Sequence, residues 1–208
     1  MTDKKKSILY ASGAILFWST VATAFKLTLE GMSNSQLLFY SSLTSVLVLF
    51  PLAYKNSPEE LKQFFSKHHL KNNTVLGLIN PFVYYLILFE AYSVLPAQEA
   101  QPINLTWPLI ISIFSALFLK QKLSVRTVIG LLISFAGVVV IATRGNLLNL
   151  HFHNLYGVLL ALSSSFIWAS FWILNLLDKR EESVKLFGSF FFGTVYTGIY
   201  ILLFGSFG

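Results

Sequence analysis

The residues best suited to chemistry lie in one stretch, 96–120, which is apolar enough to cross a bilayer. Glu99 and Thr106 belong to it, and at about 100° per residue a further set falls on one face of a helix. This polar stripe consists of Gln101, Asn104, Pro108, Ser112 and Ser115. Amide and hydroxyl groups can hydrogen-bond a solute, and a carboxylate can carry a charge or a proton. The stripe is therefore expected to face protein or water rather than lipid.

Two prolines, Pro102 and Pro108, interrupt the same stretch. Each removes a backbone donor and frees carbonyl oxygens of the preceding turn, which water in a cavity can satisfy and lipid cannot. A purely structural interpretation stays open, since serine and asparagine often only bind a neighbouring helix and prolines often only kink. We favour the functional interpretation because polar residues in membrane helices frequently mark solute or ion pathways.

A second polar stripe lies in the first apolar segment, beside Trp18. Its members are Ser12, Ser19, Thr23, Lys26 and Glu30, which fall within about 60° of one another on a helix. Lys26 could reach the headgroups or pair with Glu30 one turn on. It could instead pair with Glu90 or Glu99, because helix rise places the three at similar depths. The carboxylate left over would then be free to titrate.

The third apolar segment carries Asn80, Pro81 and Tyr84 near its middle, so we expect a kink there. The loop before it begins like a helix at Asn56–Glu60 and is expected to lie on the membrane surface. Leu61, Phe64 and Phe65 would share the apolar face of that short helix. His68 and His69 are expected at the interface rather than on a metal.

Composition places all these residues in an integral membrane protein. Hydrophobic residues make up 55% of the chain and charged residues 12%, with a mean hydropathy of +0.66, whereas soluble domains carry about 25% charged residues. The absence of cysteine excludes disulfides, thiolate metal sites and cysteine nucleophiles. The net charge of +6 is distributed over alternate loops, which indicates membrane topology rather than nucleic-acid binding.

Seven segments are long enough to span a bilayer, which needs about 20 apolar residues. They are 7–29, 35–54, 74–94, 97–119, 124–143, 155–177 and 184–207. The predicted fold is therefore an all-α integral membrane protein with seven transmembrane helices.

Lysine and arginine gather in alternate loops. One side would hold Lys4, Lys5, Lys6, Lys55, Lys62, Lys67, Lys71, Lys120, Lys122, Arg126, Lys179, Arg180 and Lys185, and the other only Arg144. The positive-inside rule then places the N-terminus in the cytoplasm and the C-terminus outside. A cleaved signal peptide ending at Ala22-Thr23-Ala24 is the alternative, but its removal would invert every later loop against the charge bias.

The sequence contains an internal repeat, whose second copy follows a loop near residue 146. The run 166–169 parallels 16–19, and 186–187 parallels 38–39. Since an odd number of crossings separates the copies, the second would run in the opposite sense, as an inverted repeat. We therefore expect a first unit of five helices at 1–146 and a partial second unit of two helices at 147–208.

Three motifs carry a resemblance to a known family: PAQEA at 96–100, NLTWP at 104–108, and Gly130 followed by Ala136-Gly137. They resemble the fourth and fifth helices of EamA-type transporters of the drug/metabolite transporter superfamily. The Asn-x-x-Trp-Pro pattern is most similar to the aromatic amino acid exporter branch. The resemblance implies a multi-pass protein of the bacterial inner membrane that exports small organic metabolites such as amino acids.

The resemblance also implies two five-helix units, from which this chain departs by about three helices. We expect that the natural chain continues past Gly208 or that a second copy, in a homodimer, closes the cavity. Solute would lie near the midplane between the first, third, fourth and sixth helices. The candidate contacts are Trp18, Asn80, Tyr84, Gln101, Asn104, Trp107 and Trp168, with Lys26, Glu90 and Glu99 handling charge or protons.

The sequence contains no recognisable catalytic, metal or cofactor motif, so we expect neither an enzyme nor a metal or cofactor site. The expected partners are the lipid bilayer and a small-molecule solute, not nucleic acid. A membrane-embedded transferase would need a catalytic His or Asp at a membrane face, and the four histidines lie in predicted loops. A non-transporting scaffold, or an inactive truncated remnant of a transporter, is the more serious alternative, and solute flux would distinguish it.

Overall fold

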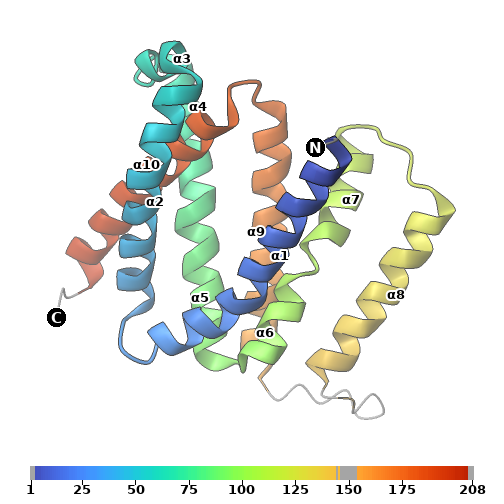
Figure 1. The fold of residues 1–208 in the computed structure, drawn as a ribbon. Coiled ribbons are helices and arrows are strands. Elements are labelled where there is room, and N and C mark those ends of the chain that lie inside the picture. Colours follow the sequence, from blue (N-terminus) through green and yellow to red (C-terminus); the bar gives the residue numbers. More distant parts are fainter. Residues whose placement is uncertain (1–2, 144, 146–153, 206–208) are drawn as a thin grey trace.

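A computed structural model describes residues 3–143, 145 and 154–205, and these residues form helices and no strand (Figure 1). Six helical segments are long and apolar enough to cross a membrane, and a seventh, Val125–Ile141, is apolar but shorter. The prediction of an all-α membrane protein is confirmed. The predicted unit boundary at 146/147 lies outside the described residues, as do Arg144, His151 and His153.

The elements follow one another as mostly antiparallel helices. In order they are α1 (Asp3–Thr28), α2 (Asn34–Asn56), α3 (Pro58–Lys62), α4 (Lys67–Gly77), η1 (Leu78–Val83), α5 (Tyr84–Val94), α6 (Ala97–Asn104), α7 (Trp107–Phe118), α8 (Val125–Ala142), α9 (Leu155–Leu177) and α10 (Glu182–Phe204). Polar residues cap the N-termini of several helices, because their side chains accept hydrogen bonds from N–H groups that the first turn leaves unpaired. Ser33 does so for α2, Ser124 for α8 and Asn154 for α9.

The two ends of the helix bundle differ in charge. The start of α1 and the connections α2–α4, α7–α8 and α9–α10 gather at one end, and the turns α1–α2 and α5–α6 at the other (Figure 1). Thirteen of the fifteen lysines and arginines belong to the first of these ends, which we call the basic end. Lys26 lies near the opposite end.

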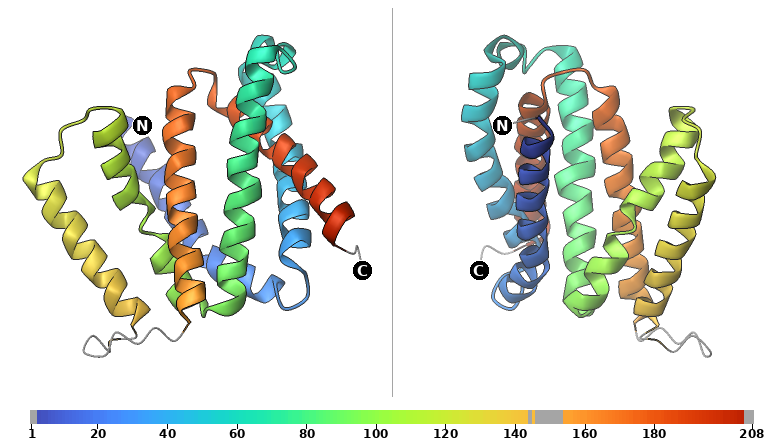
Figure 2. Two further views of the ribbon diagram at one scale, coloured as in Figure 1. Left: turned by 180° about the vertical axis from the view of Figure 1, so that it is seen from behind. Right: turned by 45° about the vertical axis from the view of Figure 1, so that its right-hand side comes forward.

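The centre of the bundle is the pair α5 and α9, which lie side by side in all views (Figure 2). Helix α10 packs on α2 and α4, while α6 and α7 pack on α9. The main core contains Leu38, Phe89, Tyr92, Leu95 and Ile103, all nearly inaccessible to solvent. Helices α1 and α8 carry many exposed apolar side chains, as expected of surfaces that contact lipid.

One span is bent and another is broken. The third span runs from Lys67 to Val94 and bends at η1, where Asn80 has extended backbone angles before Pro81. This confirms the predicted kink. The fourth breaks between Asn104 and Trp107 into two helices, so the single helical stripe predicted for 97–119 is wrong. The physical reason is Pro108, which has no N–H to donate to the carbonyl of Asn104.

The loop at the basic end also differs from expectation. Helix α3 is only five residues long, and the chain turns before α4. Phe64 is buried against Phe187 and Phe191, whereas Phe65 is 74% exposed. The predicted apolar face of a helix through Phe65 is therefore not formed, because α3 ends at Lys62 and both phenylalanines lie in the turn after it, with their rings edge to face at 5.0 Å.

Candidate functional site

A cavity of about 90 Å³ lies between α1, α5, α6, α7 and α9. Six predicted residues from four spans line it together: Trp18, Tyr84, Gln101, Asn104, Trp107 and Trp168. Aromatic and apolar side chains, including Phe25, Tyr85 and Tyr92, make up most of the remaining wall. The cavity is therefore aromatic, with two amides among its polar groups.

Aromatic pairs join opposite walls of the cavity. The rings of Tyr84 on α5 and Trp168 on α9 have centroids 4.6 Å apart. Those of Trp18 on α1 and Trp107 on α7 lie 6.4 Å apart and meet edge to face. Aromatic faces attract flat apolar groups and cations. A solute with an aromatic or aliphatic portion would find complementary surface here.

The amide of Asn104 is held from two sides. Its Nδ2 donates to the Ser164 hydroxyl of α9 at 2.9 Å, and its Oδ1 lies 3.4 Å from the donating hydroxyl of Tyr84. The hydroxyl of Tyr92 donates to the side-chain carbonyl of Gln101. Each amide retains a second hydrogen or lone pair. Both side chains are thus fixed in orientation and can still bind a solute.

The break between α6 and α7 is held by Ser165 of α9. Its Oγ lies 2.8 Å from the carbonyl oxygen of Asn104 and 3.1 Å from that of Ile103, and it accepts a hydrogen bond from Thr106 Oγ1 at 3.0 Å. The carbonyls freed by the break therefore have a protein partner, where water was expected. Sequence reasoning missed Ser164 and Ser165, although consecutive serines inside an apolar helix were a signal.

Asn80 does not line this cavity. It is buried in η1, and its Oδ1 has no hydrogen-bond partner within the described part of the chain. The neighbouring Pro81 packs where Gly193 of α10 leaves space. Asn80 therefore lies at the bend of the third span, next to a residue that meets α10, and not in the wall of the predicted solute site.

The three predicted charge-handling residues also lie outside the cavity, toward the opposite end. Glu90 accepts a hydrogen bond from Asn34 Nδ2 at 2.8 Å, and Glu99 is buried in the first turn of α6. Lys26 Nζ donates to the carbonyl oxygens of Tyr92 at 2.6 Å and Leu95 at 3.2 Å.

The predicted ion pair of Lys26 is not found. Among the described residues, no ion pair joins Lys26 to Glu30, Glu90 or Glu99. The carbonyl groups at the C-terminal end of α5 bind the Lys26 ammonium instead of a carboxylate. They lack partners within the helix and carry the negative end of its dipole.

A buried polar network at the basic end was not anticipated. Arg180 and Asp178 form an ion pair at 2.6 Å with both side chains almost inaccessible, and Arg180 Nη1 donates to Asn73 of α4 at 2.8 Å. Lys185 Nζ contacts Glu182 at 2.7 Å and the Asn175 carbonyl at 3.1 Å. From the sequence, the charged residues in 178–185 are interpreted only as topology signals.

The electrostatics of Asp178 follow from this network. Burial alone would raise the pKa of Asp178, but the hydrogen bonds and positive charge of Arg180 outweigh burial and hold the pKa below its ordinary value. The carboxylate is thus ionised at neutral pH and ties α9 to α4.

Trp107 separates the aromatic cavity from a second pocket of about 460 Å³ on the side of the basic end. The second pocket is lined by Trp107, Trp172, Asn175, Glu182 and Lys185, among others. Solute moving between the basic end and the cavity would pass this indole.

Apolar spanning helices, one of them bent and one broken, around a polar aromatic cavity define a multi-pass membrane protein of the kind that moves solutes. The chain belongs to the EamA-like transporter family, which matches residues 5–143. Since that match includes the first helix, α1 is part of the family's domain. The resemblance at the level of the drug/metabolite transporter superfamily is confirmed.

Three relatives are uncharacterized transporters. One from Archaeoglobus fulgidus is 26% identical over 164 residues, 77% of this chain and 54% of its own length. Another, YvbV of Bacillus subtilis, is 37% identical over 95 residues, covering 46% of this chain and 30% of its own. A third, from Acidianus ambivalens, is 34% identical over 109 residues, 51% and 41% of the two chains. The chain spans about half the length, or less, of these relatives.

A crystal structure of another protein shares the fold. It is 21% identical and superimposes with a TM-score of 0.69, covering 98% of this chain and 69% of its own. The arrangement of helices described above is therefore found in a longer protein as well.

Proposed function

We propose that this protein transports a small organic solute across the membrane and binds it in the aromatic cavity. The observation that supports this best is the convergence of six polar and aromatic residues, from five helices, on one cavity. Amides and tryptophans that only packed the bundle would not need to surround a common space. Amino acids are the first substrate class to test, and export is the proposed direction.

The cavity suits a solute with one apolar and one polar portion. Trp18, Trp107 and Trp168 provide aromatic surface, while Asn104 and Gln101 provide donors and acceptors. Its volume of about 90 Å³ is below the roughly 300 Å³ of most ligand pockets. Binding therefore requires the helices around Trp107 to separate.

The proposed orientation follows from the basic end. Lysine and arginine concentrate on the cytoplasmic side of membrane proteins, so the N-terminus would lie in the cytoplasm and the C-terminal end of α10 outside. We place the protein in a bacterial inner membrane. Solute would then enter by the pocket beside Lys185 and leave past Lys26, Glu90 and Glu99, which would handle charge or protons near the exit.

The matched relatives are longer than this chain, and further helices would extend the wall of the cavity. Their source would be a continuation of the chain or a second copy, as in a homodimer. The alternative function is a non-transporting membrane scaffold or an inactive remnant of a transporter. The shares of 54% and 69% covered in longer proteins are the reason to keep that alternative.

Flux into vesicles distinguishes these functions. The purified protein, reconstituted in liposomes, would be assayed with a panel of amino acids, with and without an imposed pH gradient. Uptake of at least one amino acid supports transport, and stimulation by the gradient supports proton coupling. No flux for the whole panel, from protein that is folded and inserted, would favour the scaffold.

Asn104→Leu tests the cavity itself. It should reduce flux about tenfold or more, because a buried amide contact worth over 1 kcal/mol is lost, while leucine remains compatible with a membrane helix. The matched control is Ser112→Ala, because among the described residues the Ser112 hydroxyl bonds only to the Pro108 carbonyl of its own helix, at 2.8 Å. Normal flux by Asn104→Leu would remove Asn104 from the site.

A further inference from the structure

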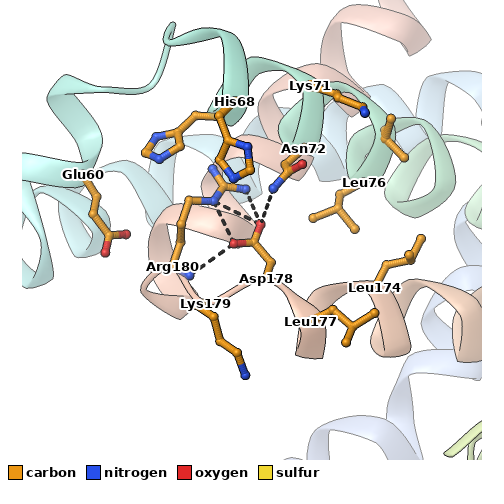
Figure 3. Close-up of a pocket in the computed structure, with 12 residues that line it drawn as sticks. Glu60, His68, Lys71, Asn72, Leu76, Leu174, Leu177, Asp178, Lys179 and Arg180 are labelled. Atoms are coloured by element: carbon orange, nitrogen blue, oxygen red, sulfur yellow. Dashed lines mark hydrogen bonds and ion pairs between the residues drawn. The ribbon is translucent and has the colours of Figure 1, made fainter. Parts of the chain in front are cut away.

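We propose that a groove at the basic end, between α4 and α9, binds the headgroup of an anionic phospholipid. The groove has a volume of about 600 Å³ and lies apart from the aromatic cavity (Figure 3). It combines an apolar floor, a fixed polar wall and two uncommitted cations. These three features together match a phosphate headgroup with its acyl chains.

The apolar floor consists of Val75 and Leu76 on α4 and Leu174 and Leu177 on α9. Val75, Leu174 and Leu177 are between 40% and 54% exposed. They belong to helices that span the membrane, so this exposed surface faces acyl chains. A free hydrophilic anion would gain nothing from such a floor.

The wall of the groove is held in place by hydrogen bonds. Both carboxylate oxygens of Asp178 receive hydrogen bonds from Arg180, and one of them also does from Asn72 (Figure 3). The other acidic side chain at the groove, Glu60, accepts the backbone N–H of Glu181 at 2.9 Å. The negative charges at the groove are therefore partly taken up by donors of the protein.

Lys71 and Lys179 provide the uncommitted positive charge. They lie on opposite sides of the groove, one on α4 and one after α9 (Figure 3). Both are exposed, and within the described residues neither Nζ has a hydrogen bond or an ion pair. Basic pockets between helices at the membrane surface are suited to anionic headgroups. The apolar floor beneath them favours a lipid over a soluble phosphate.

The test measures lipid binding by the purified protein and does not depend on transport. Native mass spectrometry would count bound phosphatidylglycerol and phosphatidylcholine across a concentration series. Wild type should retain phosphatidylglycerol preferentially, and Lys71→Gln with Lys179→Gln should weaken that binding about tenfold or more. Lys120→Gln with Lys122→Gln is the control, because it removes equal charge at the same end but outside the groove.

Three results would overturn the proposal. Equal loss in both double variants would mean general surface attraction, and equal binding of the two lipids would mean that the groove does not select charge. Displacement of phosphatidylglycerol by millimolar inorganic phosphate would indicate a soluble anion as the ligand. Leu177→Ser should weaken phosphatidylglycerol without changing the response to inorganic phosphate, and an unchanged lipid affinity would contradict the role of the floor.

Discussion

The hydroxyl of Ser165 on α9 lies 2.8 Å from the main-chain carbonyl oxygen of Asn104, at the last residue of α6. This contact joins the central helix of the bundle to the break in the fourth span. It explains how an unpaired carbonyl is tolerated in a membrane, where each unsatisfied polar group costs several kcal/mol. It also fixes the position from which the Asn104 side chain reaches the cavity.

Ser165→Ala should therefore destabilise the protein by about 1–3 kcal/mol, because the buried carbonyl of Asn104 loses its bond to the Ser165 hydroxyl, while the Thr106 hydroxyl keeps its bond to the Ile103 carbonyl. The matched substitution is Ser170→Ala on the same helix, because within the described part of the chain the Ser170 hydroxyl bonds only to the Phe166 carbonyl. Thermal unfolding in detergent would compare the two. Equal shifts would mean that Ser165 contributes no more than a local helix contact.

Lys26→Met should lower stability by about 1 kcal/mol, since the C-terminal carbonyls of α5 lose a cation. Lys26→Arg should retain most of the stability that Lys26 contributes, because the cation is kept. Combination with Glu90→Gln should be additive, because Glu90 bonds to Asn34 and not to Lys26. A double variant more stable than Lys26→Met alone would restore the ion-pair hypothesis. Denaturation in the same micelles of wild type, the three single variants including Glu90→Gln, and the double variant provides the comparison.

Stability should fall on acidification because of Asp178. Its lowered pKa means that the unfolded chain binds a proton more readily, so the stabilisation is full above the ordinary pKa of 3.8 and is lost as pH falls through the lowered value. Asp178→Asn should be less stable at neutral pH, since Arg180 is left buried without a counter-charge. It should also show a smaller loss of stability below about pH 4.

Unfolding midpoints between about pH 3 and 7 would test this. Burial would raise the pKa of Glu181, but hydrogen bonds from Ser183 and Val184 lower it overall. Protonation of Glu181 on acidification should therefore also lower stability. The contribution of Asp178 is obtained from the difference between the pH profiles of wild type and Asp178→Asn. Glu59→Gln, in an exposed pair with Lys62, should leave the profile unchanged. Parallel profiles for wild type and Asp178→Asn would contradict the assignment.

Gly193→Ala should cost about 1–3 kcal/mol through overpacking. An added Cβ would clash with Cγ of Pro81, which belongs to a ring that cannot rotate away. Gly198→Ala on the same helix gains the same helix propensity and meets Phe39 only at 3.4 Å. If both variants unfold at the same temperature, η1 and α10 are not in tight contact. Thermal unfolding in micelles is again sufficient.

Much of the fold could be predicted from the sequence. Apolar length identified the spans, because a bilayer imposes a minimum of about 20 residues on any crossing helix. The distribution of lysine and arginine identified which loops lie together at the basic end of the bundle. Six of the ten candidate site residues lie around one cavity, since aromatic and amide side chains within spans tend to face protein. Their roles in transport remain proposals.

What the sequence by itself determined is therefore the helical type and the approximate positions of the apolar segments, which depend on local composition. Tertiary structure alone decided that Ser165 holds the broken helix and that Lys26 binds the end of α5. It also decided that Asn80 lies outside the cavity. Helical periodicity specifies which residues share a face but not which neighbour that face meets. That choice depends on packing between segments far apart in the chain, as between Asn104 and Ser164, 60 residues on.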